Sequence, residues 1–480
     1  MDTSFYLNQS ISLILLIFVS LFFTILGIYH SKKFKGVNNY LTANRNIGLS
    51  SLTTSLVASA LGAWILFGPA SAASWGGIGS VIGYAFGAAF PMIFLIYLGK
   101  KIRNEFPKGS SLIEFLRKKF GKSLFKLILL MTIFYMFIFL CAEVTAVAVL
   151  INFISGAELW ITALIVLLAT LTYTLYGGLR ASIFTDNIQM IVIGFLLLIS
   201  VIYIILFTGN KFSFEFIRET NPQLLSTSYI PNYTAGLTFF IAVAATNLFH
   251  QGNWQRVYAA KNYETLKKSL IISFLIIVPI VFFMGFVGMV SFSIDSSNRA
   301  DLGFFSLLLK EQTEILSLII IVLGLALTIS TVDTLINAIS SLFVVDGKAA
   351  LNLDKKTDYL KLSKYFIIFL SLIAFFIASR GFDILYLFLL ADLFCCAFVF
   401  TVFYSFYNKD IKEKTAYISI IIGLIGGFLM FPFPDFSKSL LVGVLLPVEI
   451  FAPFVLQSLL FLSFVVATFL PVVILKVKKM

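Results

Sequence analysis

Long apolar runs recur along the whole chain, and they limit what it can fold into more than any other feature. A transmembrane helix needs about 20 predominantly apolar residues. Hydrophobic residues make up 60% of the 480 residues and charged residues only 12%, which is too little charge to cover one large aqueous core. We therefore predict an all-α protein that lies in a lipid bilayer. Its thirteen predicted transmembrane helices are residues 11–29, 50–74, 78–99, 124–154, 159–176, 186–207, 235–254, 270–293, 316–345, 365–379, 382–407, 415–431 and 454–475.

The positive charges are unevenly distributed between the connections of these helices. With the N-terminus outside, 29 of the 35 Lys and Arg residues fall in connections predicted to face the cytoplasm. Cytoplasmic connections of membrane proteins carry such an excess. The bias predicts an N-terminus outside and a C-terminus in the cytoplasm. The expected location is the plasma (inner) membrane. The net charge of +12 is then a sign of topology, and it does not predict a nucleic-acid partner.

The residues that usually build enzyme or metal sites are scarce. The three cysteines lie inside apolar runs without a CxxC spacing, and there are only two histidines. The sequence contains no HExxH, GxSxG or phosphate-loop motif. We therefore predict neither an enzyme nor a protein with a bound cofactor.

Two predicted helices are interrupted. The run LVASALGAWILFGPASAASWGG in segment 50–74 contains Gly62, Gly68 and Pro69, and segment 235–254 carries several polar residues near its end. Each interrupted helix begins a group of five, an arrangement that marks the binding site in transporters. The predicted units are a first helix and cytoplasmic loop (1–49), a five-helix repeat (50–207), an extracellular loop (208–233), a second five-helix repeat (234–407), and two C-terminal helices with a tail (408–480).

The run GGLRASIFTDNIQMIVIGF at residues 177–195 resembles the signature of the sodium/solute symporters, and so does LALTISTVDTLINAISSLFVVD at 325–346. This family includes sodium-coupled sugar, proline, sialic acid and urea-type carriers. The resemblance implies a leucine-transporter-like fold, in which a 5+5 inverted repeat has one additional helix before it and two after it. It also implies secondary active transport by alternating access, with sodium as the coupling ion.

The expected activity is therefore sodium-coupled symport of a small polar organic solute into the cell. The expected solute is an amino acid such as proline, or urea or a related nitrogenous compound. The alternatives are a sodium-independent or proton-coupled permease and a transporter-like sensor.

The resemblance also implies a sodium site. Its ligands would be the carbonyl groups of Ala58, Leu61 and Leu327 and the hydroxyl groups of Ser330 and Thr331. Sodium is a hard cation that prefers oxygen ligands. The structural alternative is that both hydroxyls bond back to the preceding helical turn, as is common in membrane helices.

A carboxylate at the centre of a bilayer costs roughly 3 kcal/mol or more, so an acid in an apolar run is a functional candidate. The resemblance implies a second sodium site at Asp186, Asp333 and Thr334. The alternative for these acids, Asp333 in particular, is a structural ion pair with Arg180 or Arg256. The acids found in apolar runs are Glu143, Asp186, Asp333 and Asp392, and the last is assigned no role.

The resemblance also implies a substrate pocket where the interrupted helices meet segments 124–154 and 382–407. An acid on segment 124–154 would favour an ammonium or urea-like group. The candidate substrate-binding residues are Ser59, Trp64, Glu143, Asn247, His250 and Gln251.

Overall fold

A computed structural model describes residues 5–34, 36–297, 299–310, 313–351, 358–408, 410–450 and 458–477. Within these residues the fold is helical throughout, with only isolated β-bridges between loops. Ten of the described helices are long and apolar enough to cross a membrane. They are α1 (Gln9–Ser31), α4 (Gly68–Glu105), α6 (Lys122–Ser155), α7 (Leu159–Thr208), α11 (Tyr263–Ile294), α13 (Glu314–Leu342), α15 (Tyr359–Ala378), α16 (Ile384–Ser405), α17 (Glu413–Met430) and α19 (Leu459–Val477).

The structure describes eight further α-helices besides these ten. They are α2 (Val37–Thr42), α3 (Leu49–Ala60), α5 (Leu112–Lys119), α8 (Phe214–Thr220), α9 (Ile230–Phe249), α10 (Gln251–Ala259), α12 (Gly303–Leu308) and α14 (Lys348–Leu351), with the 3₁₀ turn η2 (Ala63–Leu66) among the intervening turns.

Two of the long helices contain a residue with non-helical backbone angles. Gly77 in α4 has φ 55° and ψ −155°, and Gly178 in α7 has φ 57° and ψ −149°. A positive φ is readily accessible only to glycine, so these residues interrupt the helical path. Gly77 separates predicted segments 50–74 and 78–99, and Gly178 separates segments 159–176 and 186–207. The predicted start of the last segment, residue 454, lies outside the described residues.

The two predicted interruptions are present. The first lies between α3, which ends at Ala60, and η2, because Leu61 and Gly62 leave the helical conformation. The second lies at His250, whose φ of −59° and ψ of 108° separate α9 from α10. Both interruptions are buried in the protein, where irregular backbone is tolerated at membrane depth.

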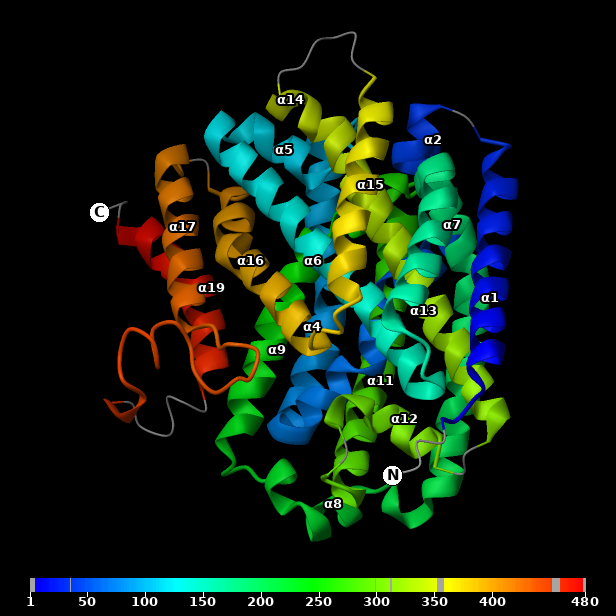
Figure 1. Cartoon of the computed structure of the whole chain (residues 1–480). Coiled ribbons are helices and arrows are strands. Elements are labelled where there is room, and N and C mark those ends of the chain that lie inside the picture. The colour runs from blue at the N-terminus through cyan, green and yellow to red at the C-terminus, as the bar shows by residue number, and fades with distance from the viewer. Residues whose placement is uncertain are drawn as a thin grey trace.

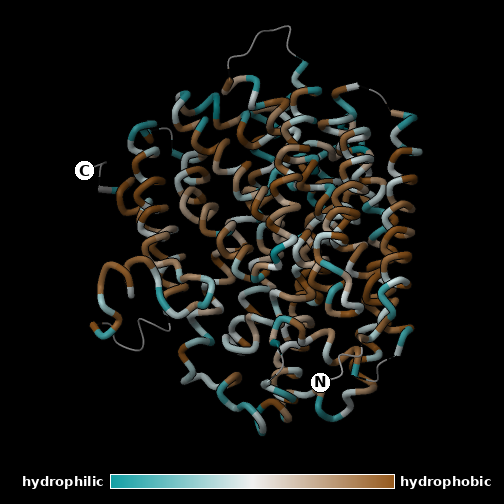
Figure 2. Tube along the Cα trace, in the orientation of Figure 1, coloured by the Kyte–Doolittle hydropathy of each residue, from teal (hydrophilic) through white to brown (hydrophobic). Residues whose placement is uncertain are grey.

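The helices form one bundle with two distinct ends (Figure 1). The short helices α2, α5 and α14 lie at one end, and α8 and α12 lie at the other. Figure 2 shows apolar residues along most of the bundle and more polar residues at its ends. Large apolar side chains also face outward from the bundle, such as Phe18 at 65%, Ile191 at 73% and Leu206 at 70% exposure. Such a surface is stable in contact with lipid, as expected of an integral membrane protein.

Helices α4 and α9 approach each other closely through glycines. A Cβ atom added to Gly79 would lie 1.7 Å from the carbonyl oxygen of Asn232, and one added to Gly83 would lie 2.0 Å from that of Gly236. Small residues at a helix interface let the two backbones pack directly. This contact joins the part of α4 that follows the Gly77 break to the helix before the second interruption.

Candidate functional site

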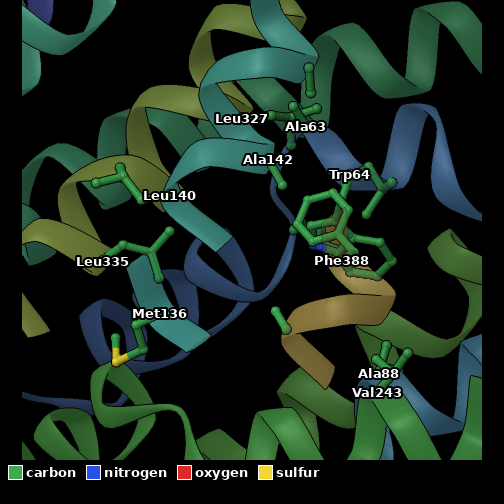
Figure 3. Packing of buried hydrophobic residues seen from close by; sticks show 14 of the residues in the cluster. Ala63, Trp64, Ala88, Met136, Leu140, Ala142, Val243, Leu327, Leu335 and Phe388 are labelled. Atoms are coloured by element: carbon green, nitrogen blue, oxygen red, sulfur yellow. The ribbon is translucent and has the colours of Figure 1, made fainter. Parts of the chain in front are cut away.

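The first interruption brings together the residues predicted to bind sodium. Ala58 and Leu61 lie at the end of α3, and both are fully buried. The last carbonyl groups of a helix have no partner within that helix, so they are available to a ligand. Figure 3 shows Ala63 and Leu327 close to Ala142, where η2, α13 and α6 meet.

The two hydroxyl groups on α13 differ in their contacts. Ser330 Oγ donates to Asp186 Oδ1 at 2.8 Å. Thr331 Oγ1 is buried without a hydrogen-bond partner among the described residues. Among the described contacts, neither hydroxyl therefore bonds back to the preceding helical turn. Thr331 Oγ1 remains free to bind an ion.

Asp186, in the signature sequence on α7, forms a buried ion pair. Its Oδ2 lies 2.8 Å from Nη2 of Arg256, and both side chains are fully buried. Ser55 Oγ also donates to Asp186 Oδ2 at 2.6 Å. The negative charge of Asp186 is thus neutralised by a cation of the protein itself.

Arg256 connects four elements. Its Nη2 also donates to Thr334 Oγ1 at 3.0 Å, its Nε donates to Ser55 Oγ at 2.8 Å, and its Nη1 donates to the carbonyl oxygen of Gly252 at 3.1 Å. These contacts join α10 to α3, α7 and α13. The sequence left Arg256 and Arg180 as alternative partners of the buried acids, because nothing in a linear sequence identifies which acid lies beside which arginine.

Asp333 has hydroxyl partners instead of an arginine in the described structure. Its Oδ2 accepts from Tyr173 at 2.5 Å and from Thr185 at 3.2 Å, and its Oδ1 accepts from Ser182 at 2.8 Å and from Thr334 at 3.3 Å. Tyr173 and Ser182 were not singled out from the sequence, and no motif there would have identified them. The described salt bridges include none to Asp333.

Glu143 on α6 lies beside the first interruption. Its Oε2 accepts from the backbone N–H of Ala63 at 2.8 Å, while Oε1 has no hydrogen-bond partner among the described residues. A Cβ added to Gly62 would lie 2.2 Å from Glu143 Oε1 and 2.8 Å from Thr331 Oγ1. The acid therefore lies close to the predicted sodium ligands.

A small cavity lies between the two interruptions, with a free volume of about 30 Å³. Of the six predicted substrate residues, four line it: Ser59, Trp64, Asn247 and His250. Glu143 is not among the described lining residues. Gln251 is directed elsewhere, because its Nε2 donates to the carbonyl oxygen of Ser110 at 3.0 Å and to Ser341 Oγ at 3.3 Å.

Asp392 also lines this cavity, although sequence reasoning gave it no role. Its Oδ1 accepts from Thr246 at 2.6 Å, and it lies on α16. Figure 3 shows the Phe388 ring, one turn earlier on α16, close to the Trp64 ring of η2. The position of Asp392 inside an apolar run was the signal that could have found it. The aromatic residues at this cavity are Trp64, Tyr84, Phe139 and Phe388.

Solved transporter structures share this fold. One, described as the substrate-bound outward-open state of a Na⁺-coupled sialic acid symporter, matches 96% of this chain and 98% of its own with a TM-score of 0.71 at 19% identity. Another is MHP1, a nucleobase-cation-symport-1 family transporter, which matches 93% of this chain and 95% of its own with a TM-score of 0.58 at 14% identity. At these identities the likeness shows the fold alone.

Sequence relatives are also transporters. A spermidine transporter of Candida albicans is 25% identical over 318 residues, which are 66% of this chain and 60% of that protein. Sodium/glucose cotransporter 4 of Mus musculus is 24% identical over 290 residues, which are 53% of this chain and 40% of that protein. The chain thus matches about 60% and 40% of the length of these two relatives. The model of the sodium:solute symporter family matches residues 40–423, and the chain belongs to this family of membrane transporters.

Proposed function

We propose that this protein is a sodium-coupled symporter for a small organic solute that carries a cationic or donor-rich nitrogen group. The observation that carries the proposal is the cavity between the two interruptions, where Asp392 is the acid among the described lining residues and no lysine or arginine lines the wall. A carboxylate surrounded by aromatic rings favours an organic cation, because the acid supplies charge and the ring faces attract cations. The same wall disfavours an anion.

The proposed coupling ion is sodium, bound at the interruption in the second predicted helix. The free hydroxyl of Thr331 and the terminal carbonyl groups of α3 supply the hard oxygen ligands that sodium prefers. Thr331 also lines the substrate cavity, so the ion and the solute would meet at one residue. This contact offers a direct route by which binding of one stabilises binding of the other.

The proposed transport cycle opens the cavity in turn to each side. A free volume of about 30 Å³ has room for about one or two water molecules, so an organic solute fits only after the walls separate. We propose thirteen crossings, with 50–207 and 234–407 as the inverted repeats. The interruptions at Gly77 and Gly178, each placed between two predicted segments, support this number. The proposed N-terminus is outside, and the end with α2, α5 and α14 is cytoplasmic.

For the second predicted sodium site we propose a different occupant. The sequence predicts a sodium ion at Asp186, Asp333 and Thr334, and two of these residues contact Arg256. We propose that the guanidinium group holds this position, so that one sodium ion enters with each solute. Asp333 would then be held by its hydroxyl partners without a bound ion.

The solute class is tested by transport into proteoliposomes under an inward sodium gradient. Spermidine, urea, proline and glucose are compared as labelled substrates, with choline replacing sodium as the control. We expect the amine to accumulate, and we expect Asp392→Asn to lower its uptake by at least about tenfold, the effect of losing one charged contact. Asp392→Asn should leave sodium binding unchanged.

A sugar is the second candidate, because sodium/glucose cotransporters are among the relatives and two polar side chains of the cavity, Asn247 and His250, can bond to hydroxyl groups. Sodium-driven glucose uptake that is unaffected by Asp392→Asn would replace the amine proposal with this one. Accumulation that persists when choline replaces sodium would refute sodium coupling.

A further inference from the structure

Two buried oxygen atoms without partners lie close to Gly62. They are Oε1 of Glu143 and Oγ1 of Thr331, and neither has a hydrogen-bond partner among the described residues. The position that a Cβ of residue 62 would take lies 2.2 Å from the first atom and 2.8 Å from the second, so only glycine leaves room for both oxygens here. Because both distances meet at one point, the two oxygen atoms are at most about 5 Å apart, close enough for one ion to contact both.

The charge of Glu143 is not balanced by the protein in the described structure. The side chain is fully buried, and the described salt bridges include none to it. The N–H group of Ala63 donates to Oε2 at 2.8 Å, and Oε1 has no hydrogen-bond partner among the described residues. A buried carboxylate is costly unless a cation pairs with it. Asp186 shows the contrast, because Arg256 neutralises it.

Neighbouring backbone supplies further oxygen atoms at this point. The helix α3 ends two residues before Gly62, and two carbonyl groups of its last turn already have donors: Val57 accepts from Leu61 N–H and Ala60 accepts from Trp64 Nε1. The carbonyl groups of Ala58 and Ser59 have no donor among the described hydrogen bonds. An ion bound by Glu143 and Thr331 would therefore meet a carboxylate and a hydroxyl near the end of this helix, and both are hard ligands.

We infer that Glu143 Oε1 is a direct ligand of the coupling sodium ion, which it shares with Thr331. The inference rests on the proposed sodium coupling and adds a charged ligand to that site. It also separates the two buried acids near the cavity by role: Glu143 receives the metal ion, and Asp392 receives the solute. The bound sodium ion then neutralises Glu143, so that Asp392 remains the uncompensated charge for an organic cation.

The test measures sodium binding without solute. Thermal unfolding of the purified protein is followed in increasing sodium chloride, with choline chloride keeping the ionic strength constant, because a bound ion raises stability by mass action. We expect Glu143→Gln to raise the sodium concentration for half-maximal stabilisation by at least about tenfold, the effect of losing one charged ligand. Asp392→Asn is the matched control, and its sodium titration should equal that of the wild type.

A second measurement uses the wild-type protein and does not depend on the folding of a variant. Dicyclohexylcarbodiimide reacts with buried carboxyl groups, and mass spectrometry locates the modified residue. We expect sodium to protect Glu143 from this reagent and spermidine in choline buffer to give no protection. An unchanged sodium titration in folded Glu143→Gln, or labelling of Glu143 that sodium does not reduce, would overturn the inference while sodium coupling stands. A wild-type protein that sodium does not stabilise would instead refute sodium coupling, and this inference with it.

Discussion

Replacing Arg256 by glutamine would test the buried ion pair most directly. The guanidinium group is fully buried and bonds to Ser55, Asp186, Thr334 and the backbone of Gly252. Removing one partner of a buried pair leaves the other charge uncompensated, at a cost of roughly 3–5 kcal/mol. We therefore expect Arg256→Gln to lower the free energy of unfolding by about this amount.

The measurement is denaturation of purified protein in mixed micelles, with expression level as a second readout. Arg180→Gln is the matched control, because this arginine is partly exposed and bonds to the carbonyl oxygen of Ala43 at 3.0 Å. It should cost about 1 kcal/mol or less. The double variant Arg256→Gln/Asp186→Asn should lose less than the two single variants together, with a coupling of roughly 1–3 kcal/mol. Equal stability of Arg256→Gln and Arg180→Gln would refute the reasoning.

The same variant tests the proposed ion stoichiometry. With one sodium ion per cycle, uptake by the wild type should rise with sodium concentration with a Hill coefficient near one. Removing the guanidinium group leaves Asp186 and Thr334 without their cation, so a second sodium ion could bind there. We therefore expect the Hill coefficient for sodium to increase in folded Arg256→Gln. A wild-type coefficient near two would show that a second sodium ion binds although Arg256 is present.

Three further predictions concern other parts of the protein. Thr331→Ala should weaken sodium binding by at least about fivefold, measured by the thermal titration, because the free hydroxyl is removed. Gly79→Ala should lower the melting temperature, because its Cβ would lie 1.7 Å from a carbonyl oxygen. Gly194→Ala is the control, because a Cβ at that position meets no atom within 4 Å. Equal melting temperatures of the two variants would argue against the close packing. Cysteines replacing the exposed Ser228 and Lys108 should react with an impermeant thiol reagent from outside only and from inside only, respectively; labelling of both from one side would refute the topology.

The sequence was sufficient to predict the all-helical class and both interruptions. Apolar length depends only on local composition, and the glycines around Leu61 and the polar residues around His250 are themselves local signals. The breaks at Gly77 and Gly178 likewise fall between segments that the apolar pattern already separated.

The pairing of buried charges could not be predicted in the same way. Asp186 and Arg256 are 70 residues apart in the sequence. From the sequence alone, Asp333 could equally have paired with Arg180 or with Arg256. Asp392 was given no role because its depth within the helix was unknown, whereas the folded chain places it at the cavity. Such assignments depend on how helices rotate about their axes, which is decided by packing across the whole bundle.

The glycine contact between α4 and α9 has a mechanical consequence. At Gly79 and Gly83 the two backbones touch without side chains between them, so neither helix can slide past the other without losing this fit. The break at Gly77 lies between this contact and the first interruption, whereas α9 runs from the contact to His250 without a break. A tilt of the part of α4 after Gly77 would therefore carry α9 with it, and the backbone would have to bend at Gly77 and at His250.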